Sequence, residues 1–126
     1  MEQSRDDQLK RVRQQTHVGV GDLRQFEQHT LLPIIRFQST LIYSQIKNEL
    51  AVKYKAFNAF NQTEQKRLVK LLISQDVKLK QSLIHTVTSL FTMEEFKFYE
   101  KHAFELNKRI LKIIEERLHL NLEKLL

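Results

Sequence analysis

Histidine and carboxylate side chains are the groups of this sequence best suited to metal binding or acid–base chemistry. The chain has five histidines and no cysteine. A di-metal helical bundle needs two E-x-x-H pairs and two further inward glutamates, because two ions require several carboxylates and imidazoles. Here that spacing occurs once, at Glu116 and His119, among the charged residues Lys112, Glu115 and Arg117. No H-E-x-x-H motif is present. We therefore predict no metal site and no cofactor.

His85 differs from the other histidines because it interrupts the most apolar part of the chain. Ile84 and Val87 flank it, and hydroxyl side chains lie nearby in sequence. A buried imidazole in this position could titrate or bind a ligand, so His85 is the candidate for a ligand pocket. The interpretation we favour is a histidine at the edge of the core, hydrogen-bonded to a neighbouring hydroxyl or carbonyl.

Hydroxyl and paired acidic residues give no catalytic pattern. For Ser82, Thr86, Thr88 and Ser89, no local motif indicates the base and the orienting acid that an activated hydroxyl needs. Serines and threonines inside helices usually bond back to the carbonyl four residues earlier. Adjacent carboxylates, as at 94–95, point in different directions around a helix. We predict no catalytic residue and interpret the chain as non-enzymatic.

The basic residues are concentrated in one segment. The net charge is +6, and residues 53–80 contain seven basic side chains against Glu64 and Asp76. Lys66, Arg67 and Lys70 could contact phosphates while nearby aromatic side chains approach bases; those aromatics are Tyr54, Phe57 and Phe60. The alternative, which we favour, is a solvated lysine face with the aromatics in the core, since no nucleic-acid-binding signature is present.

Glycine and proline, the usual helix breakers, are nearly absent. The 126 residues include two glycines and one proline, and neither type occurs after Pro33. The length suits one domain, and the sequence predicts an all-α fold. Its first residues lack the apolar core of a secretory signal, and no window approaches 18 uninterrupted apolar residues. We therefore expect a cytoplasmic protein without membrane association.

Helix boundaries can be predicted from several capping residues. Residues 1–21 are too polar to bury a helical face independently, so we expect a mobile N-terminal arm, or a helix that forms only on a partner, followed by a helical domain over 22–126. Asp22 is suited to cap a short turn, and Pro33 is suited to the first turn of a helix that reaches about Lys55.

Further helix starts follow along the second half of the chain. Asn61 precedes a helix over 63–74, Asp76 begins the next, and Thr92 with Glu95 forms a capping box. The last stretch is one bent helix or two helices that meet near His102. Short connections favour antiparallel neighbours. We therefore predict an up-and-down bundle of four to five helices.

The C-terminal helix has more apolar positions than one core-facing stripe requires. Between 106 and 126 these are positions 106, 110, 111, 113, 114, 118, 120, 122, 125 and 126. Leu111, Leu118 and Leu125 are spaced by seven, and a second copy could cover them if they face away from the core. We predict a homodimer through this face. The alternative is a bundle that simply wraps its last helix more fully.

Short motifs spread over residues 22–122 resemble those of a known protein family. They comprise Phe26, Thr30, Leu31, Leu32, Pro33, Gln38, Gln75, Asp76, Leu79, Leu83, Phe91, Thr92, Glu94, Glu95, Phe96, Tyr99, Leu106, Asn107, Lys108 and Arg109. The pattern resembles a family of short helical proteins from Bacteroidetes-type bacteria, some labelled "glyoxalase". The resemblance implies a bacterial, intracellular, helical protein. It carries over no catalytic residue, because βαβββ glyoxalases hold His and Glu ligands on strands and this sequence predicts none.

Taken together, the sequence favours a non-enzymatic, helical protein-interaction module that self-associates through its C-terminal helix. One alternative is a small-molecule enzyme or ligand-binding bundle with a pocket near His85, as the glyoxalase label suggests. Another is nucleic-acid binding through residues 53–80. The sequence identifies no particular protein partner.

Overall fold

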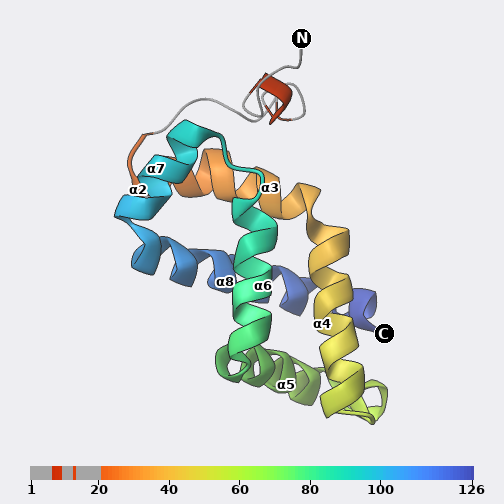
Figure 1. The fold of residues 1–126 in the computed structure, drawn as a ribbon. Coiled ribbons are helices and arrows are strands. Elements are labelled where there is room, and N and C mark those ends of the chain that lie inside the picture. Colours follow the sequence, from red (N-terminus) through yellow and green to blue (C-terminus); the bar gives the residue numbers. More distant parts are fainter. Residues whose placement is uncertain (1–6, 10–12, 14–20) are drawn as a thin grey trace.

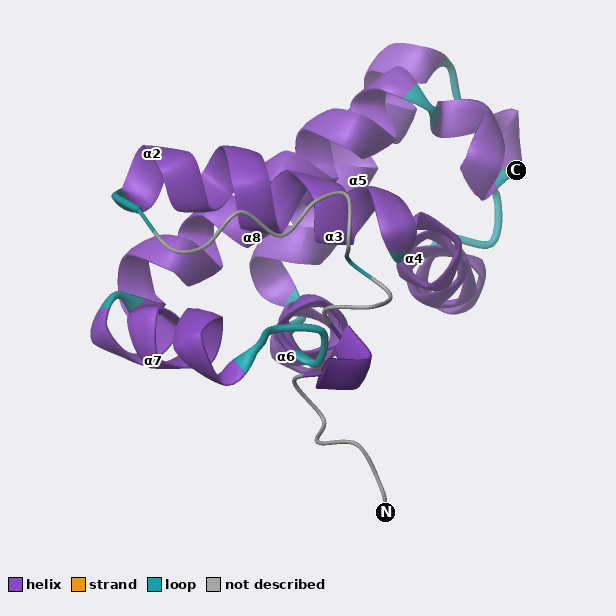
Figure 2. Cartoon of the chain, turned by 90° about the horizontal axis from the view of Figure 1, so that it is seen from above, coloured by secondary structure: helices purple, strands orange, loops and turns teal. Residues whose placement is uncertain are grey.

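The described part of the chain is a helical bundle. The computed structural model describes residues 7–9, 13 and 21–126, and these residues contain helices and no strand (Figures 1 and 2). The prediction of an all-α bundle is confirmed. Most of the predicted arm, residues 1–21, lies outside the described residues. Of its described members, Leu9 and Arg13 are buried, with 9% and 4% of their surface exposed.

The first helical run begins at the predicted cap and has a wider turn before the proline. Asp22 accepts a hydrogen bond from the backbone N–H of Gln25 and caps α2, Leu23–Phe26. A π-helical turn, Glu27–Leu31, leads into α3, Leu32–Phe37. Pro33 has no N–H to donate to a preceding carbonyl. A π turn changes the bonding pattern at that point, so the chain stays helical through the proline.

The predicted helix from Pro33 to Lys55 is divided into two. Gln38, with φ −90° and ψ 7°, separates α3 from α4, Ser39–Lys53. The Ser39 hydroxyl donates to the carbonyl of Ile35 at 2.9 Å, a contact that bends helices. The side chain of Gln38 also donates to the carbonyl of Thr86 at 3.0 Å. The side chain at the break, Gln38, therefore links the start of α4 to α6.

The next two helices begin where the capping residues predicted. Asn61 accepts from the N–H of Glu64 at the start of α5, Gln62–Gln75, after a 3₁₀ turn at Phe57–Ala59. Asp76 accepts from the N–H of Leu79 at the start of α6, Val77–Thr88. Each cap satisfies a backbone donor that the helix leaves free.

The C-terminal stretch forms two helices. The Thr92 and Glu95 capping box opens α7, Met93–Lys101, as predicted. His102, with φ −130°, leaves the helical conformation and separates α7 from α8, Ala103–Leu120. A final 3₁₀ turn covers Leu122–Leu125. Of the two alternatives that the sequence left open, one bent helix or two helices, the structure shows two helices that meet at His102.

The core lies between α8 and the helices around it. Helices α4 and α6 lie side by side and run in opposite directions, with α5 crossing their ends (Figure 1); Figure 2 views α4 and α6 nearly end-on. Helix α8 contacts α5, α6, α7 and the last 3₁₀ turn. Phe26 and Phe91 meet edge to face, with ring centroids 5.5 Å apart. This arrangement gives α8 neighbours on several sides.

Candidate functional site

A mixed apolar and charged groove runs along one edge of α8. Its volume is about 340 Å³, and we call it the Leu120 groove. It is lined by Glu27, Leu32, Lys112, Ile113, Glu116, Arg117 and Leu120. The side chain of Leu120 is 81% exposed. Burying a leucine of this kind is worth about 1.5–3 kcal/mol, so the groove is a strong candidate for a contact surface.

Helix geometry explains why these residues meet. Ile113 and Leu120 are seven residues apart, close to two helical turns, and so they share a side of α8. The π turn and the start of α3 bring Glu27 and Leu32 against that side. Ile113 is buried and Leu120 is exposed. The edge therefore grades from core to surface at the end of the helix.

The charges around the groove are balanced. Glu27 and Glu116 are acidic, and Lys112 and Arg117 are basic. A neighbouring groove of about 390 Å³ shares Glu27 and Lys112 and continues along α8. Nη1 of Arg109 lies 3.9 Å from Oε1 of Glu27. This edge thus differs from the chain as a whole, whose net charge is +6.

The leucines predicted to form a free face do not form one. Leu118 and Leu125 are 0% and 3% exposed and belong to the core, and Leu111 is half-buried against it. Their surroundings explain the result, because α8 is packed by several elements and needs a broad apolar surface. The assignment of this face to a partner was wrong. Of the remaining apolar positions, Leu120 and Leu126 are exposed, by 81% and 50%.

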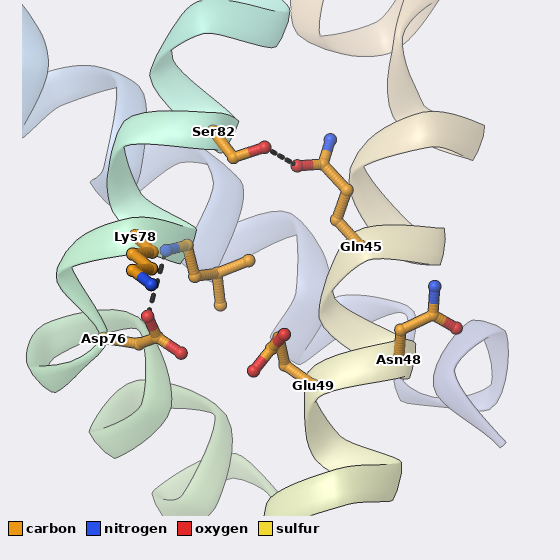
Figure 3. Close-up of a pocket in the computed structure, with 7 residues that line it drawn as sticks. Gln45, Asn48, Glu49, Asp76, Lys78 and Ser82 are labelled. Atoms are coloured by element: carbon orange, nitrogen blue, oxygen red, sulfur yellow. Dashed lines mark hydrogen bonds between the residues drawn. The ribbon is translucent and has the colours of Figure 1, made fainter.

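A second groove, between α4 and α6, is polar. Its volume is about 350 Å³, and its lining includes Gln45, Glu49, Asp76 and Ser82 (Figure 3). Asp76 accepts a hydrogen bond from the side chain of Lys53 at 2.6 Å. The pKa of Asp76 is held below its ordinary value mainly by this bond. The hydrogen bond from the N–H of Leu79 is the second cause.

The hydroxyls beside this groove are structural. Ser82 donates to the amide oxygen of Gln45, and Gln45 donates to the hydroxyl of Thr86 at 2.9 Å. Thr86 in turn donates to the carbonyl of Ser82, four residues earlier, at 2.8 Å. The backward bond expected of helical hydroxyls is therefore present. The network joins α4 to α6, and none of these contacts supplies a base that could activate a hydroxyl.

His85 lies apart from the grooves described above. It is exposed on α6 and lines none of them. The helix turns this position to solvent while Leu83 and Val87 face the core. The interpretation of His85 as a core-edge histidine was therefore wrong, and a ligand pocket at His85 stays a prediction. Within the described ranges, no three histidine or acidic side chains lie together in a way that could hold a metal ion.

The three predicted basic residues are exposed on α5. Lys66, Arg67 and Lys70 share its outer surface. Arg67 bonds to Glu64 at 2.5 Å, and this hydrogen bond lowers the pKa of Glu64. Phe57 is 4% exposed and belongs to the core. The structure thus brings the cations together but removes Phe57 from the set of aromatics that could stack on bases.

A buried polar cluster at the start of α7 was missed by the sequence analysis. Glu95 is 0% exposed and pairs with Arg13, which is also buried. Thr30 donates to the same carboxylate at 3.1 Å. The capping box predicted the position of Glu95 but gave no signal of its burial. Arg13 is one of several basic residues in a polar stretch, so its partner could not be read from sequence.

The chain has no recognised relatives in three comparisons. No significant match is found among protein-family models, curated proteins or solved structures. The resemblance to a bacterial helical family therefore remains a prediction. In the part of the chain that the structure describes, no helix combines the length and apolar character needed to cross a bilayer.

Proposed function

We propose that this protein is a non-enzymatic helical interaction module that forms a homodimer through the Leu120 groove. The observation that carries the proposal is the 81% exposure of Leu120 beside a groove with its own apolar lining. In a two-fold dimer the same patch serves both copies. Leu120 of each copy would then enter the groove of the other, against Leu32 and Ile113.

The balance of charge supports a second copy as the occupant. Residues 53–80 are strongly basic, so two copies that met there would repel each other. The Leu120 groove instead contains two acidic and two basic side chains. In a two-fold arrangement, Glu27 and Glu116 of one copy can face Lys112 and Arg117 of the other. A neutral patch with both signs suits self-association better than any wholly basic surface.

The proposal is tested by the oligomeric state of the full chain. We expect sedimentation velocity and light scattering to show a concentration-dependent dimer, and Leu120→Glu to raise its dissociation constant at least about tenfold, because a charge would enter the apolar contact. Val52→Glu is the matched control, since Val52 is 71% exposed on α4, away from the groove residues. A monomeric wild type, or equal effects of both variants, would refute the dimer.

A further inference from the structure

The start of α7 has a carboxylate that is built into the interior. Glu95 is the third residue of α7 and has no exposed surface. One oxygen accepts from the N–H of Thr92 at 2.9 Å and from the guanidinium of Arg13. The other oxygen accepts from the hydroxyl of Thr30. A glutamate of a capping box normally reaches back over an exposed helix end, so this one is unusual in its burial.

Burial makes the carboxylate dependent on its partners. Removing a charge from water costs several kcal/mol, and strong hydrogen bonds with an opposite charge must offset that cost. Thr30 and Thr92 are each 1% exposed, and the N-terminal end of α7 is the positive end of its dipole. These groups favour the ionised carboxylate but supply no full positive charge. The guanidinium of Arg13 supplies it.

The two sides of this contact come from distant parts of the chain. On one side, the carbonyl of Leu90 and the carboxylate of Glu95 accept from Arg13. Thr30 in the π turn and the backbone of Thr92 donate to that carboxylate and hold it in place. Arg13 is 77 residues from Leu90 and 82 from Glu95. Its Nη1 donates to the carbonyl of Leu90 at 3.3 Å as well as to Glu95. Both bonds come from one nitrogen of the guanidinium, so a single cationic group links the two acceptors.

The segment that contains Arg13 presents two anchors. The N–H of Arg13 donates to the carbonyl of Leu9 at 2.8 Å. Both side chains are buried. Among residues 1–18 the aliphatic anchors are only Leu9, Val12 and Val18. The burial of Leu9 and the ion pair of Arg13 with Glu95 thus hold two points of this segment against the rest of the protein.

We propose that the carboxylate of Glu95, held by Thr30, and the carbonyl of Leu90 form a binding site for an arginine side chain, with the N-terminal segment as its tethered ligand. The same segment of a second copy can replace it. Tethering gives the chain's own arginine an effective concentration of about a millimolar, so replacement requires high protein concentration or loss of the internal arginine. This site is separate from the Leu120 groove and does not depend on it.

A peptide of residues 1–20 with a fluorescent label tests the site against full-length protein. The acceptor is the Arg13→Ala chain in a Leu120→Glu background, which removes association through the groove. We expect the peptide to bind this acceptor at least about tenfold more tightly than the same peptide with Arg13→Ala, because only the former restores the ion pair. The matched acceptor, which also contains Glu95→Gln, should lose this preference.

Two results would overturn the arginine site. One is equal binding of the arginine and alanine peptides to the Arg13→Ala acceptor, and the other is an unchanged preference after Glu95→Gln. Circular dichroism shows whether the acceptors are folded. If they are not, the chain with Arg13 intact serves as acceptor, with weaker but still arginine-dependent peptide binding expected at millimolar peptide. Equal or absent binding of both peptides there would refute the proposal.

Discussion

Two helices of this protein begin with a carboxylate that is paired to a distant cation, but in opposite surroundings. Asp76 caps α6 and pairs with Lys53 across 23 residues, with the two side chains 13% and 43% exposed. Glu95 belongs to the capping box of α7 and pairs with Arg13 across 82 residues, with 0% and 4% exposure. The capping residues give a similar signal in the sequence at both helices, but the two ion pairs differ in how far their side chains are exposed to solvent.

The difference shows that burial, more than pairing, decides how much a carboxylate matters to the fold. Water screens the pair between Asp76 and Lys53, and exposed pairs contribute little. Without its partners, Glu95 would remain a charge in the interior, where isolated ions are costly. We therefore expect α6 to tolerate loss of its ion pair and the site at Glu95 to tolerate loss of one partner poorly.

The largest expected effect comes from breaking the buried pair. Arg13→Ala or Glu95→Ala should each lower the free energy of unfolding by about 3–5 kcal/mol, because each removes one charge of a buried ion pair and leaves the other buried. Urea unfolding followed by circular dichroism measures this loss. If either variant lowers the free energy of unfolding by no more than the loss of an exposed ion pair does, the contrast between the two sites is wrong.

The matched control removes both charges together. The double variant Arg13→Met and Glu95→Leu should recover much of the loss, because apolar side chains of similar volume avoid an unpaired buried charge. Part of the loss should persist, since Glu95→Leu also removes an acceptor for Thr30 and Thr92. Additive losses in the double variant would mean that the two charges do not act as a pair.

A smaller effect is expected at Thr30. Thr30→Val keeps the shape of the side chain but removes the hydroxyl that donates to Glu95 at 3.1 Å. Hydrogen bonds to charged groups are worth about 1.5–3 kcal/mol, so stability should fall by that amount. Thr30→Val should hardly change the stability of the double variant Arg13→Met and Glu95→Leu, which lacks the carboxylate. A full loss in both backgrounds would place the role of Thr30 elsewhere.

The cap of α6 should matter less. Asp76→Ala removes both the acceptor for the N–H of Leu79 and the partner of Lys53, and loss of an N-cap costs about 1 kcal/mol. Asp76→Asn separates the two contributions, because an amide oxygen can still cap the helix without the charge. Thermal unfolding should rank the wild type first, Asp76→Asn second and Asp76→Ala third.

Capping residues explain why helix starts could be predicted from sequence. Asn61, Asp76 and the pair Thr92 and Glu95 act over three residues, so the sequence alone defines the contact. The break at Gln38 could not be predicted, because it involves Thr86 on another helix. Local hydrogen bonds are visible in sequence, and contacts that depend on how helices pack are not.

The same limit explains the errors about the candidate site. A seven-residue spacing put Leu118 and Leu125 on one side of α8, but spacing does not say which sides the neighbouring elements cover. Leu120 stays exposed because it lies at the end of the helix, near the edge that meets Leu32. His85 was likewise assigned from its apolar neighbours, although its own position faces solvent.

The smallest expected effect is that of Lys53→Met, and its dependence on pH sharpens the contrast. Lys53 lowers the pKa of Asp76, so this contribution is present above the ordinary aspartate value of about 3.9 and is lost as the pH falls through the lower, folded value. Asp76 raises the pKa of Lys53, so the contribution also disappears as the pH rises through that raised value. The stability difference between wild type and Lys53→Met should therefore be level near neutral pH and narrow at both extremes. Lys47→Met, an exposed change on the same helix, is the control.

Added salt should reduce the difference in stability between wild type and Lys53→Met, because exposed charges are screened, whereas the loss of stability caused by Arg13→Ala should change little. Equal salt sensitivity at the two sites would show that their different burial does not control their energetics.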